Sequence, residues 1–162
     1  MNTSMEQCDK RDKHGKCNKG VARRFLEETQ NRNREAAYAE LCTADYLEHD
    51  PSMPRQTVGL AEATQVYREL IAAFGLRHTA ESLIAEGDLA SARFTVRGRH
   101  TGEYRGNPPS GRSFEATGQI TLRCDEGKIA ETWINWDLPG ALEQLRPGPG
   151  EAGTPSAGRE RP

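Results

Sequence analysis

Apolar residues recur every three or four positions between residues 59 and 74. The apolar positions of this stretch are Leu60, Ala63, Val66, Tyr67, Leu70, Ile71 and Phe74. This spacing follows the 3.6-residue period of an α-helix with one apolar face. Two shorter stretches of similar spacing precede it, around residues 21–29 and 36–41. The pattern therefore predicts two short helices followed by one long helix.

Beyond Gly75 the pattern changes to segments of strand length. Four of them follow one another: "LRHTAESLIAEG", "LASARFTVRGRHTGEY", "RSFEATGQITLRCDEG" and "KIAETWINWD". The short "EGD" and "DEGK" connections are typical of hairpin turns, whereas "RGNPPSG" is a longer Pro/Gly loop. We expect a four-stranded antiparallel meander, closed by a short helical turn over "LPGALEQL".

Helices first and a curled sheet afterwards indicate an α+β fold in which the helices cover one face of the sheet. A sheet that curls around helices leaves a cavity between its concave face and those helices. Residues from facing strands converge in that space. We therefore expect any chemical site to lie in this cavity.

The two ends of the chain differ from the patterned region. Residues 1–19 are polar and lack helical or strand periodicity, so we expect a disordered arm there. Residues 147–162 hold four Pro and four Gly and are expected to form a disordered tail. One folded domain is therefore predicted over residues 20–146.

Composition argues against several broad functions. Lys and Arg number 22 against 24 Asp and Glu, a net charge of −2, so no overall positive field favours nucleic acid. No apolar run reaches the roughly 18 residues that a membrane helix requires. The N-terminal segment also lacks the apolar stretch of a secretory signal. We therefore expect a cytoplasmic protein with neither nucleic-acid nor membrane partners.

The cysteines predict neither disulfides nor a metal site. Cys8, Cys17, Cys42 and Cys124 are scattered, and such cysteines in a reducing compartment are mostly free thiols. Cys8 and Cys17 flank His14, but eight residues separate them instead of the two to four typical of zinc ligands. The GK[ST] signature of a phosphate-binding loop is missing as well.

Three segments of the chain together resemble a known family. They are "DYLEHDP" after the second predicted helix, "GRHTGEYRGNPPSGRSF" in the central hairpin and "GKIAETWINWDLPGALEQL" at the end. Over roughly residues 20–146 the chain is similar to the SnoaL-like polyketide cyclases, also called ester cyclases. The most specific part is the H-x-G-x₃-G-x-P-P-x-G-R loop from His100 to Arg112. The resemblance implies a cone-shaped α+β barrel like that of nuclear transport factor two, a homodimer, and a small polyketide or aromatic ligand in the cone.

The resemblance also implies a chemistry. The family's cyclases close a ring by an intramolecular aldol reaction without metal or organic cofactor. They use an aspartate acid/base on the last strand, a histidine one strand earlier and an asparagine near the second helix. Alignment places these positions at Ile134, Ile120 and Glu48, where none of the three residue types is retained. A related branch, similar to cofactor-free hydroxylases of anthracycline antibiotic biosynthesis, shares the cone but not these residues.

Asp137 is the first candidate for a replacement acid/base. It is the only carboxylate in the final strand-to-helix corner, close to where the resemblance places the cavity. Asp followed by Leu-Pro-Gly is also a good helix start, because the carboxylate accepts a hydrogen bond from a first-turn N–H. The residue is therefore either catalytic or only a helix cap.

Two histidines are the candidate partners of this acid. Pro51 forces the residues before it into extended geometry near the mouth of the cone, where His49 is placed to act as an acid/base. His100 matches a histidine that the family keeps before its Pro-Pro loop. Each of them is either a pocket residue or a structural one satisfied by neighbouring groups.

Alternation along the strands separates the other candidates. Arg93 lies on the face opposite to Phe94, so it is either a solvated surface residue or an inward guanidinium that stabilises an enolate or carboxylate. Trp133 and Trp136 are three positions apart and so point to opposite faces. Trp136 shares its face with Ile134 and is the better candidate for stacking an aromatic ligand. The predicted substrate-binding residues are Arg93, Trp133, Trp136, Ile120 and Ile134.

Three functions follow from these residues. The leading hypothesis is a cofactor-free enzyme that cyclises a polyketide or related aromatic ketone or ester, with Asp137 as acid/base and His49 or His100 as its partner. The second is a cofactor-independent hydroxylase of the same family, in which Ile120 and Ile134 shape a dry pocket. The third is a small-molecule-binding module without catalysis.

Overall fold

The computed structural model describes residues 18–27 and 34–147. Residues 18–27 are helical. The labelled helices are α2 (Arg34–Leu41), α3 (Leu60–Phe74) and α4 (Leu138–Gln144). The strands are β1 (Cys42–His49), β2 (Thr57–Gly59), β3 (Arg77–Glu86), β4 (Leu89–Arg99), β5 (Ser113–Asp125) and β6 (Lys128–Trp136). The predicted arm and tail lie almost entirely outside the described residues.

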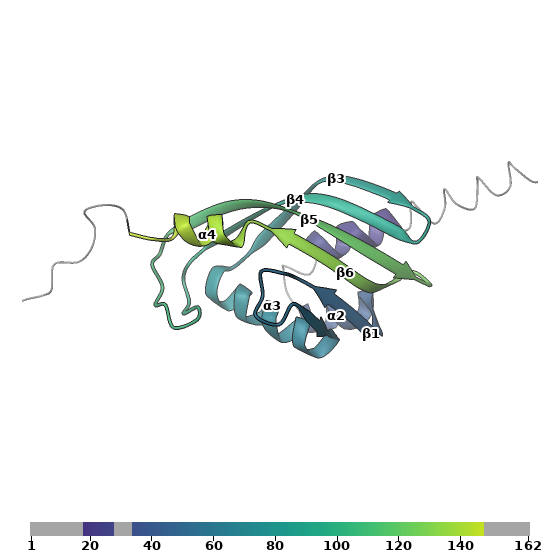
Figure 1. Ribbon diagram of the computed structural model, residues 1–162, viewed down its shortest axis with the longest axis horizontal. Coiled ribbons are helices and arrows are strands. Elements are labelled where there is room, and N and C mark those ends of the chain that lie inside the picture. Colours follow the sequence, from purple (N-terminus) through teal and green to yellow (C-terminus); the bar gives the residue numbers. More distant parts are fainter. Residues whose placement is uncertain (1–17, 28–33, 148–162) are drawn as a thin grey trace, which may run out of the picture.

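The strands form one six-stranded sheet in the order β2-β1-β6-β5-β4-β3. Strands β3 to β6 pair antiparallel with their sequence neighbours, which confirms the predicted meander. Its two tight turns place Gly87 and Gly127 at φ of 60° and 82°, a left-handed conformation that glycine adopts at low cost. Figure 1 shows the sheet curving over α2 and α3. The predicted α+β architecture is therefore confirmed.

The sheet differs from the prediction at one edge. We expected four antiparallel strands, but β1 and β2 extend the sheet to six, and β1 runs parallel to β6. Strand β1 begins directly after α2, because Leu41 and Cys42 are consecutive residues. No Gly or Pro marks this boundary in the sequence. Its inward positions also include the polar residues Tyr46 and Glu48, so the usual apolar alternation is hidden.

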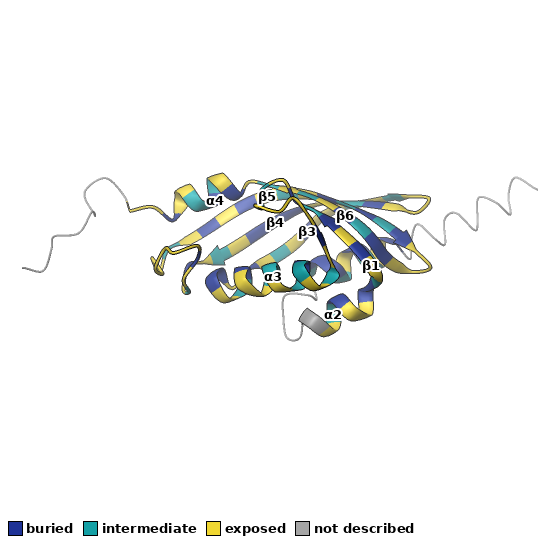
Figure 2. Ribbon diagram, turned by 60° about the horizontal axis from the view of Figure 1, so that its bottom comes forward, coloured by how far each residue is buried: buried dark blue, intermediate teal, exposed yellow. Residues whose placement is uncertain are grey.

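Helix α3 packs its apolar face against the concave side of the sheet (Figure 2). Its buried residues are Ala63, Leu70, Ala73 and Phe74. The helix ends at Gly75, whose φ of 57° is left-handed and whose N–H donates to the carbonyl oxygen of Ile71. The facing strands contribute buried side chains such as Phe94 and Ile120. Helices and sheet thus enclose the space in which a site was expected.

Candidate active site

A cavity of about 50 Å³ lies between the helices and the concave face of the sheet. Its walls are mostly apolar, and strands β4, β5 and β6 supply one of them. Ile120 on β5 and Ile134 on β6 are partners on neighbouring strands and lie side by side in this wall. The lining residues are Phe25, Leu26, Tyr38, Glu48, Asp50, Met53, Val66, Tyr67, Leu70, Leu76, His78, Phe94, Ile120, Ile134 and Trp136.

Glu48 brings a carboxylate to this apolar cavity. Alternation along β1 turns Tyr46 and Glu48 inward, and Glu48 is only 7% exposed. The hydroxyl groups of Tyr46 and Tyr38 both donate to Glu48 Oε2, at 2.9 and 3.4 Å. Thr132 Oγ1 lies 2.7 Å from the Tyr46 hydroxyl and continues the chain. Hydrogen-bond donors thus stabilise a negative charge on Glu48 inside the cone.

The charge of Glu48 acts on its buried neighbours. Burial, and then the Glu48 carboxylate, raises the pKa of the Tyr46 hydroxyl well above its usual value. The same two causes raise the pKa of the Cys42 thiol to about 12. Tyr46 therefore remains a hydrogen-bond donor, and Cys42 remains a thiol and not a nucleophilic thiolate. Among these side chains, Glu48 is the one suited to accept a proton.

A histidine and a tyrosine form a second polar group of the cavity. His78 Nδ1 on β3 lies 3.0 Å from the Tyr67 hydroxyl on α3. The His78 ring also packs edge-on against Phe94, with centroids 5.3 Å apart. An imidazole and a phenol can each donate a hydrogen bond to a substrate oxygen or relay a proton. The cavity therefore holds a carboxylate and a separate donor pair.

Asp50 is the other carboxylate of the cavity wall. Its Oδ1 accepts hydrogen bonds from Ser52 N–H at 2.8 Å and from Ser52 Oγ at 2.6 Å. Its backbone N–H donates to the Gln56 carbonyl oxygen at 2.9 Å. These contacts fix the turn between β1 and β2. Asp50 is thus explained by the local structure.

A model of the SnoaL-like polyketide cyclase family matches residues 20–145. The chain belongs to this family. No curated protein matches it significantly. In the part of the chain that the structure describes, no helix is long and apolar enough to cross a membrane.

Solved structures of similar fold agree with this membership. IdmH from Streptomyces antibioticus, described as a candidate polyketide cyclase, is 30% identical, with a TM-score of 0.66 over 74% of this chain and 92% of that one. A candidate SnoaL-like cyclase from Jannaschia sp. CCS1 is 21% identical, with a TM-score of 0.75 over 83% and 95% of the two chains. AclR from Streptomyces galilaeus, described as a candidate hydroxylase, is 23% identical, with a TM-score of 0.69 over 79% and 94%. The last two show a shared fold alone.

Three of the predicted substrate-binding residues of this SnoaL-like protein line the cavity. Ile120, Ile134 and Trp136 all face inward, and Trp136 shares its face with Ile134 as the alternation along this strand predicted. Two positions that align with the family's acid/base residues are therefore apolar cavity wall. The third, Glu48, is the buried carboxylate described above. A role of these three residues in binding substrate remains a prediction.

Asp137 lies outside the cavity. Its side chain is exposed, and Oδ1 accepts a hydrogen bond of 2.9 Å from Gly140 N–H, so Asp137 is the N-cap of α4. Its carboxylate lines a shallow hollow of the outer sheet face together with Arg93. The helix-cap interpretation accounts for this residue. The proposed acid/base role has no support in this geometry, because a general base must reach the substrate.

We expect Asp137→Ala to lower the free energy of unfolding by about 1 kcal/mol, since it removes the cap of α4. Asp137→Asn keeps an acceptor oxygen and should cost less. Urea unfolding of both variants measures this difference. Neither variant should change ligand binding in the cavity, and a loss of binding in both would contradict the purely capping role.

His49, Trp133 and Arg93 lie on the outer face of the sheet. The rings of His49 and Trp133 stack 5.5 Å apart at an angle of 12°. His49 Nε2 lies 2.8 Å from Glu131 Oε1, and its Nδ1 lies 3.0 Å from Thr57 Oγ1. Arg93 is exposed on the same face. None of the three lines the cavity, because each alternates with an inward neighbour on its strand.

The outer cluster around Glu131 predicts a dependence of stability on pH. The hydrogen bond with His49, and then that with Arg123, lowers the pKa of the Glu131 carboxyl. A lowered pKa in the folded state stabilises the protein above the ordinary glutamate pKa of about 4.3, and this contribution is lost as the pH falls through the lowered value. We expect Glu131→Gln to flatten the acid limb of a plot of urea midpoint against pH. An unchanged acid limb would contradict this assignment.

His100 is buried but does not line the cavity. Its Nδ1 accepts a hydrogen bond of 3.2 Å from Ser110 N–H, and its ring packs 5.2 Å from that of Phe74. Its backbone pairs with both Gly111 and Arg112 across the loop. The residue therefore holds the base of the 100–112 loop on α3. The predicted catalytic role for His100 has no support in this position.

Glu48, His78 and Tyr67 are the cavity residues that sequence reasoning missed as candidates. Glu48 entered the sequence analysis only as the position at which the family's asparagine is not retained. The signal that points to it is the period of two from Tyr46 to Glu48 on an extended segment. For His78 the signal is its place between the inward residues Leu76 and Ala80. Among the described residues, no group of three His, Cys, Asp or Glu side chains is arranged to hold a metal ion.

Proposed function

We propose that this SnoaL-like protein is an enzyme that catalyses an acid/base reaction on a polyketide or related aromatic ketone or ester, with Glu48 as the base. The observation that carries the proposal is a carboxylate 7% exposed in an apolar cavity, held by two tyrosine donors. A carboxylate so placed is available to a carbon acid while bulk water is excluded. The proposed chemistry transfers protons and forms one carbon–carbon bond with no net oxidation or reduction, and therefore requires no redox cofactor.

In the proposed reaction Glu48 removes a proton from a carbon next to a carbonyl group. The His78–Tyr67 pair donates to the oxygen on which the negative charge develops. The enolate carbon then attacks a second carbonyl group of the same molecule, and the carbonyl oxygen takes the proton back from Glu48. One carbon–carbon bond forms, and the mass does not change. Trp136 and the Ile120–Ile134 pair would hold the flat substrate during these steps.

Hydroxylation is a second candidate function. Isoleucines occupy two of the family's acid/base positions and exclude water from that part of the wall. Such a surface favours attack of an enolate on dioxygen over return of the proton to the enolate carbon. In that case the enolate carbon forms a bond to dioxygen and a proton goes to the terminal oxygen, so the first product is a hydroperoxide that contains both oxygen atoms; its conversion to a hydroxyl group and water requires an added two-electron reductant. Homodimer formation, which rests on the family resemblance, and a cytoplasmic location, which rests on the sequence patterns described above, are also proposals. Sedimentation equilibrium would test the dimer.

The experiment compares the purified protein with its Glu48→Gln variant on a panel of polyketide methyl esters and anthraquinones, with and without dioxygen. A product of unchanged mass, formed by the wild type alone, supports cyclisation. A heavier product that requires dioxygen favours the hydroxylase. Binding without turnover across the panel would contradict both and leave a binding module.

A further inference from the structure

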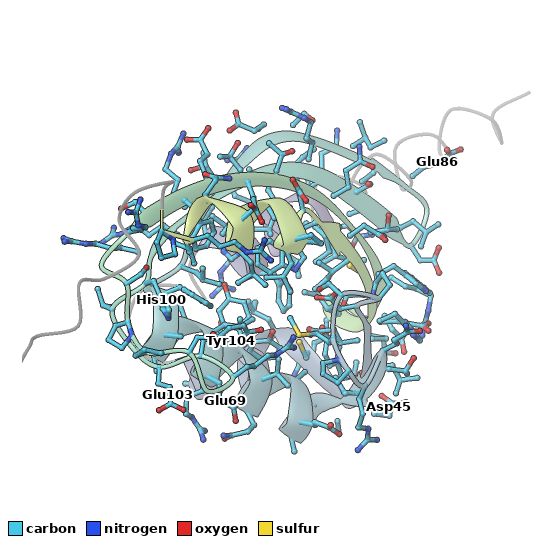
Figure 3. The ribbon with its side chains drawn as sticks, turned by 60° about the vertical axis from the view of Figure 1, so that its left-hand side comes forward. Asp45, Glu69, Glu86, His100, Glu103 and Tyr104 are labelled. Atoms are coloured by element: carbon cyan, nitrogen blue, oxygen red, sulfur yellow. The ribbon has the colours of Figure 1, made fainter. Side chains whose placement is uncertain are left out.

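Glu48 and Thr132 are brought together by the parallel pairing of β1 and β6. In this register they are Cα partners, and Thr132 is fully buried. Tyr46 lies two residues before Glu48, so its side chain points to the same face of β1. Asp45 alternates with Tyr46 and is exposed at the periphery of the molecule (Figure 3). One buried carboxylate and two buried hydroxyl groups therefore meet on the inner side of the sheet.

The proton of the Tyr46 hydroxyl fixes the direction of this hydrogen-bonded chain. A phenol carries one proton, and Tyr46 donates it to Glu48 Oε2 at 2.9 Å. The Thr132 hydroxyl lies 2.7 Å from the same phenol oxygen, so Thr132 must be the donor of that contact. Tyr38 gives Oε2 a second, longer hydrogen bond of 3.4 Å. While Glu48 is ionised, each of these three hydroxyl protons therefore has an acceptor.

Protonation of Glu48 affects this chain differently at its two oxygen atoms. A proton on Oε2 would point at a tyrosine oxygen, and one hydroxyl proton of the chain would then lose its acceptor. In a buried site, a hydroxyl proton without an acceptor costs free energy. A proton on Oε1 leaves all three hydrogen bonds in place, although a neutral carboxyl group accepts them less strongly. The chain therefore favours the ionised carboxylate and leaves Oε1 as the oxygen that takes a proton.

We propose that Thr132 is a positioning residue that acts through Tyr46. Its hydroxyl holds the Tyr46 proton on Glu48 Oε2, so that Oε2 anchors the carboxylate and Oε1 takes the proton from the substrate carbon. The same oxygen later returns this proton to the oxygen of the attacked carbonyl group. The inference rests on the proposed function and deepens it, because it names the atom that takes the proton and the two side chains that prepare it.

The test measures the protonation of Glu48 without any substrate. Infrared difference spectra of the full chain and of each variant, taken against its Glu48→Gln counterpart, isolate the carboxylate band of Glu48 as the pH changes. We expect Tyr46→Phe to move the midpoint to higher pH by roughly one to two pH units, because a hydrogen bond to the charged form is lost. Thr132→Val should move it in the same direction by less, since Tyr46 keeps its proton but loses its donor. Thr132→Ser keeps the hydroxyl and should restore the parent midpoint.

The double variant Tyr46→Phe/Thr132→Val distinguishes a chain from two independent contacts. Because Thr132 acts only through Tyr46, the double variant should have the same midpoint as Tyr46→Phe alone. It also removes both partners of one buried hydrogen bond, so it should fold even where Tyr46→Phe alone leaves the Thr132 hydroxyl unsatisfied. Asp45→Asn is the matched control, because it removes an exposed carboxylate next to Tyr46 and should leave the midpoint unchanged.

The possible outcomes separate this inference from the proposed function. The expected midpoints, together with an equal displacement of the acid limb of kcat/KM against pH, support the role of Thr132. An unchanged midpoint in Tyr46→Phe, or shifts that add in the double variant, overturn that role and leave the proposed function standing. Equal turnover by the wild type and Glu48→Gln overturns the proposed function, and the assignment of Oε1 with it, whatever the midpoints are.

Discussion

Replacing Glu48 with glutamine is expected to lower kcat by about 10²- to 10⁴-fold, the range that a positioned general base contributes. Glutamine has nearly the same shape but cannot take a proton from carbon. Its carbonyl oxygen still accepts hydrogen bonds from Tyr46 and Tyr38, so the wall of the cavity should keep its structure. The measurement is single-turnover kinetics on whichever panel compound reacts with the wild type.

Two controls make this result specific to Glu48. Asp137→Asn removes a carboxylate from the outer face and should leave kcat unchanged. Asp50→Asn removes one from the same cavity wall, but Asp50 is bound by Ser52, so a reduction of no more than a few-fold is expected. Full activity in Glu48→Gln would show that the carboxylate is structural. Equal losses of kcat in the Glu48 and Asp50 variants would show that the negative electrostatic potential of the cavity matters, and not a general base at Glu48.

The helices and the meander were predictable because local patterns determine them. The apolar spacing of residues 59–74 and the turns at Gly87 and Gly127 are short-range signals that the structure confirms. Strand β1 could not be found in this way. Its partners on β6 lie 84 to 87 residues further along the chain, and their pairing is parallel, so no hairpin turn marks it.

The candidate site shows the same division between local and distant information. Alternation along β6 predicted that Trp136 shares the face of Ile134, and both residues line the wall, as does Ile120, which the resemblance pointed to. The catalytic candidates Asp137 and His49 were chosen by residue type and because they lie in the segments that resemble the family. Both lie outside the cavity. Their positions depend on which face of a strand or corner turns inward. That is decided by pairing with distant strands.

Alanine at Gly118 is expected to lower the free energy of unfolding by about 1–3 kcal/mol, the cost of overpacking a filled core. Gly118 lies on β5 between Phe94 on β4 and Trp136 on β6. A Cβ atom there would lie 2.5 Å from Phe94 Cζ, 2.7 Å from Trp136 Cβ and 2.8 Å from the Asn135 carbonyl oxygen. The third of these neighbours is backbone and cannot rotate away. Thermal and urea unfolding measure the loss.

The control is Gly20→Ala in the helix of residues 18–27, where a Cβ atom would meet no atom within 4 Å. There the same substitution should stabilise the protein by about 0.5–1 kcal/mol, because alanine favours a helix. Gly118 is what allows Phe94 and Trp136 to line the cavity side by side. We therefore expect Gly118→Ala also to weaken the quenching of Trp136 by anthraquinones. Normal stability and normal quenching would mean that the two rings move apart without cost, and that the cavity wall is less closely packed than its geometry indicates.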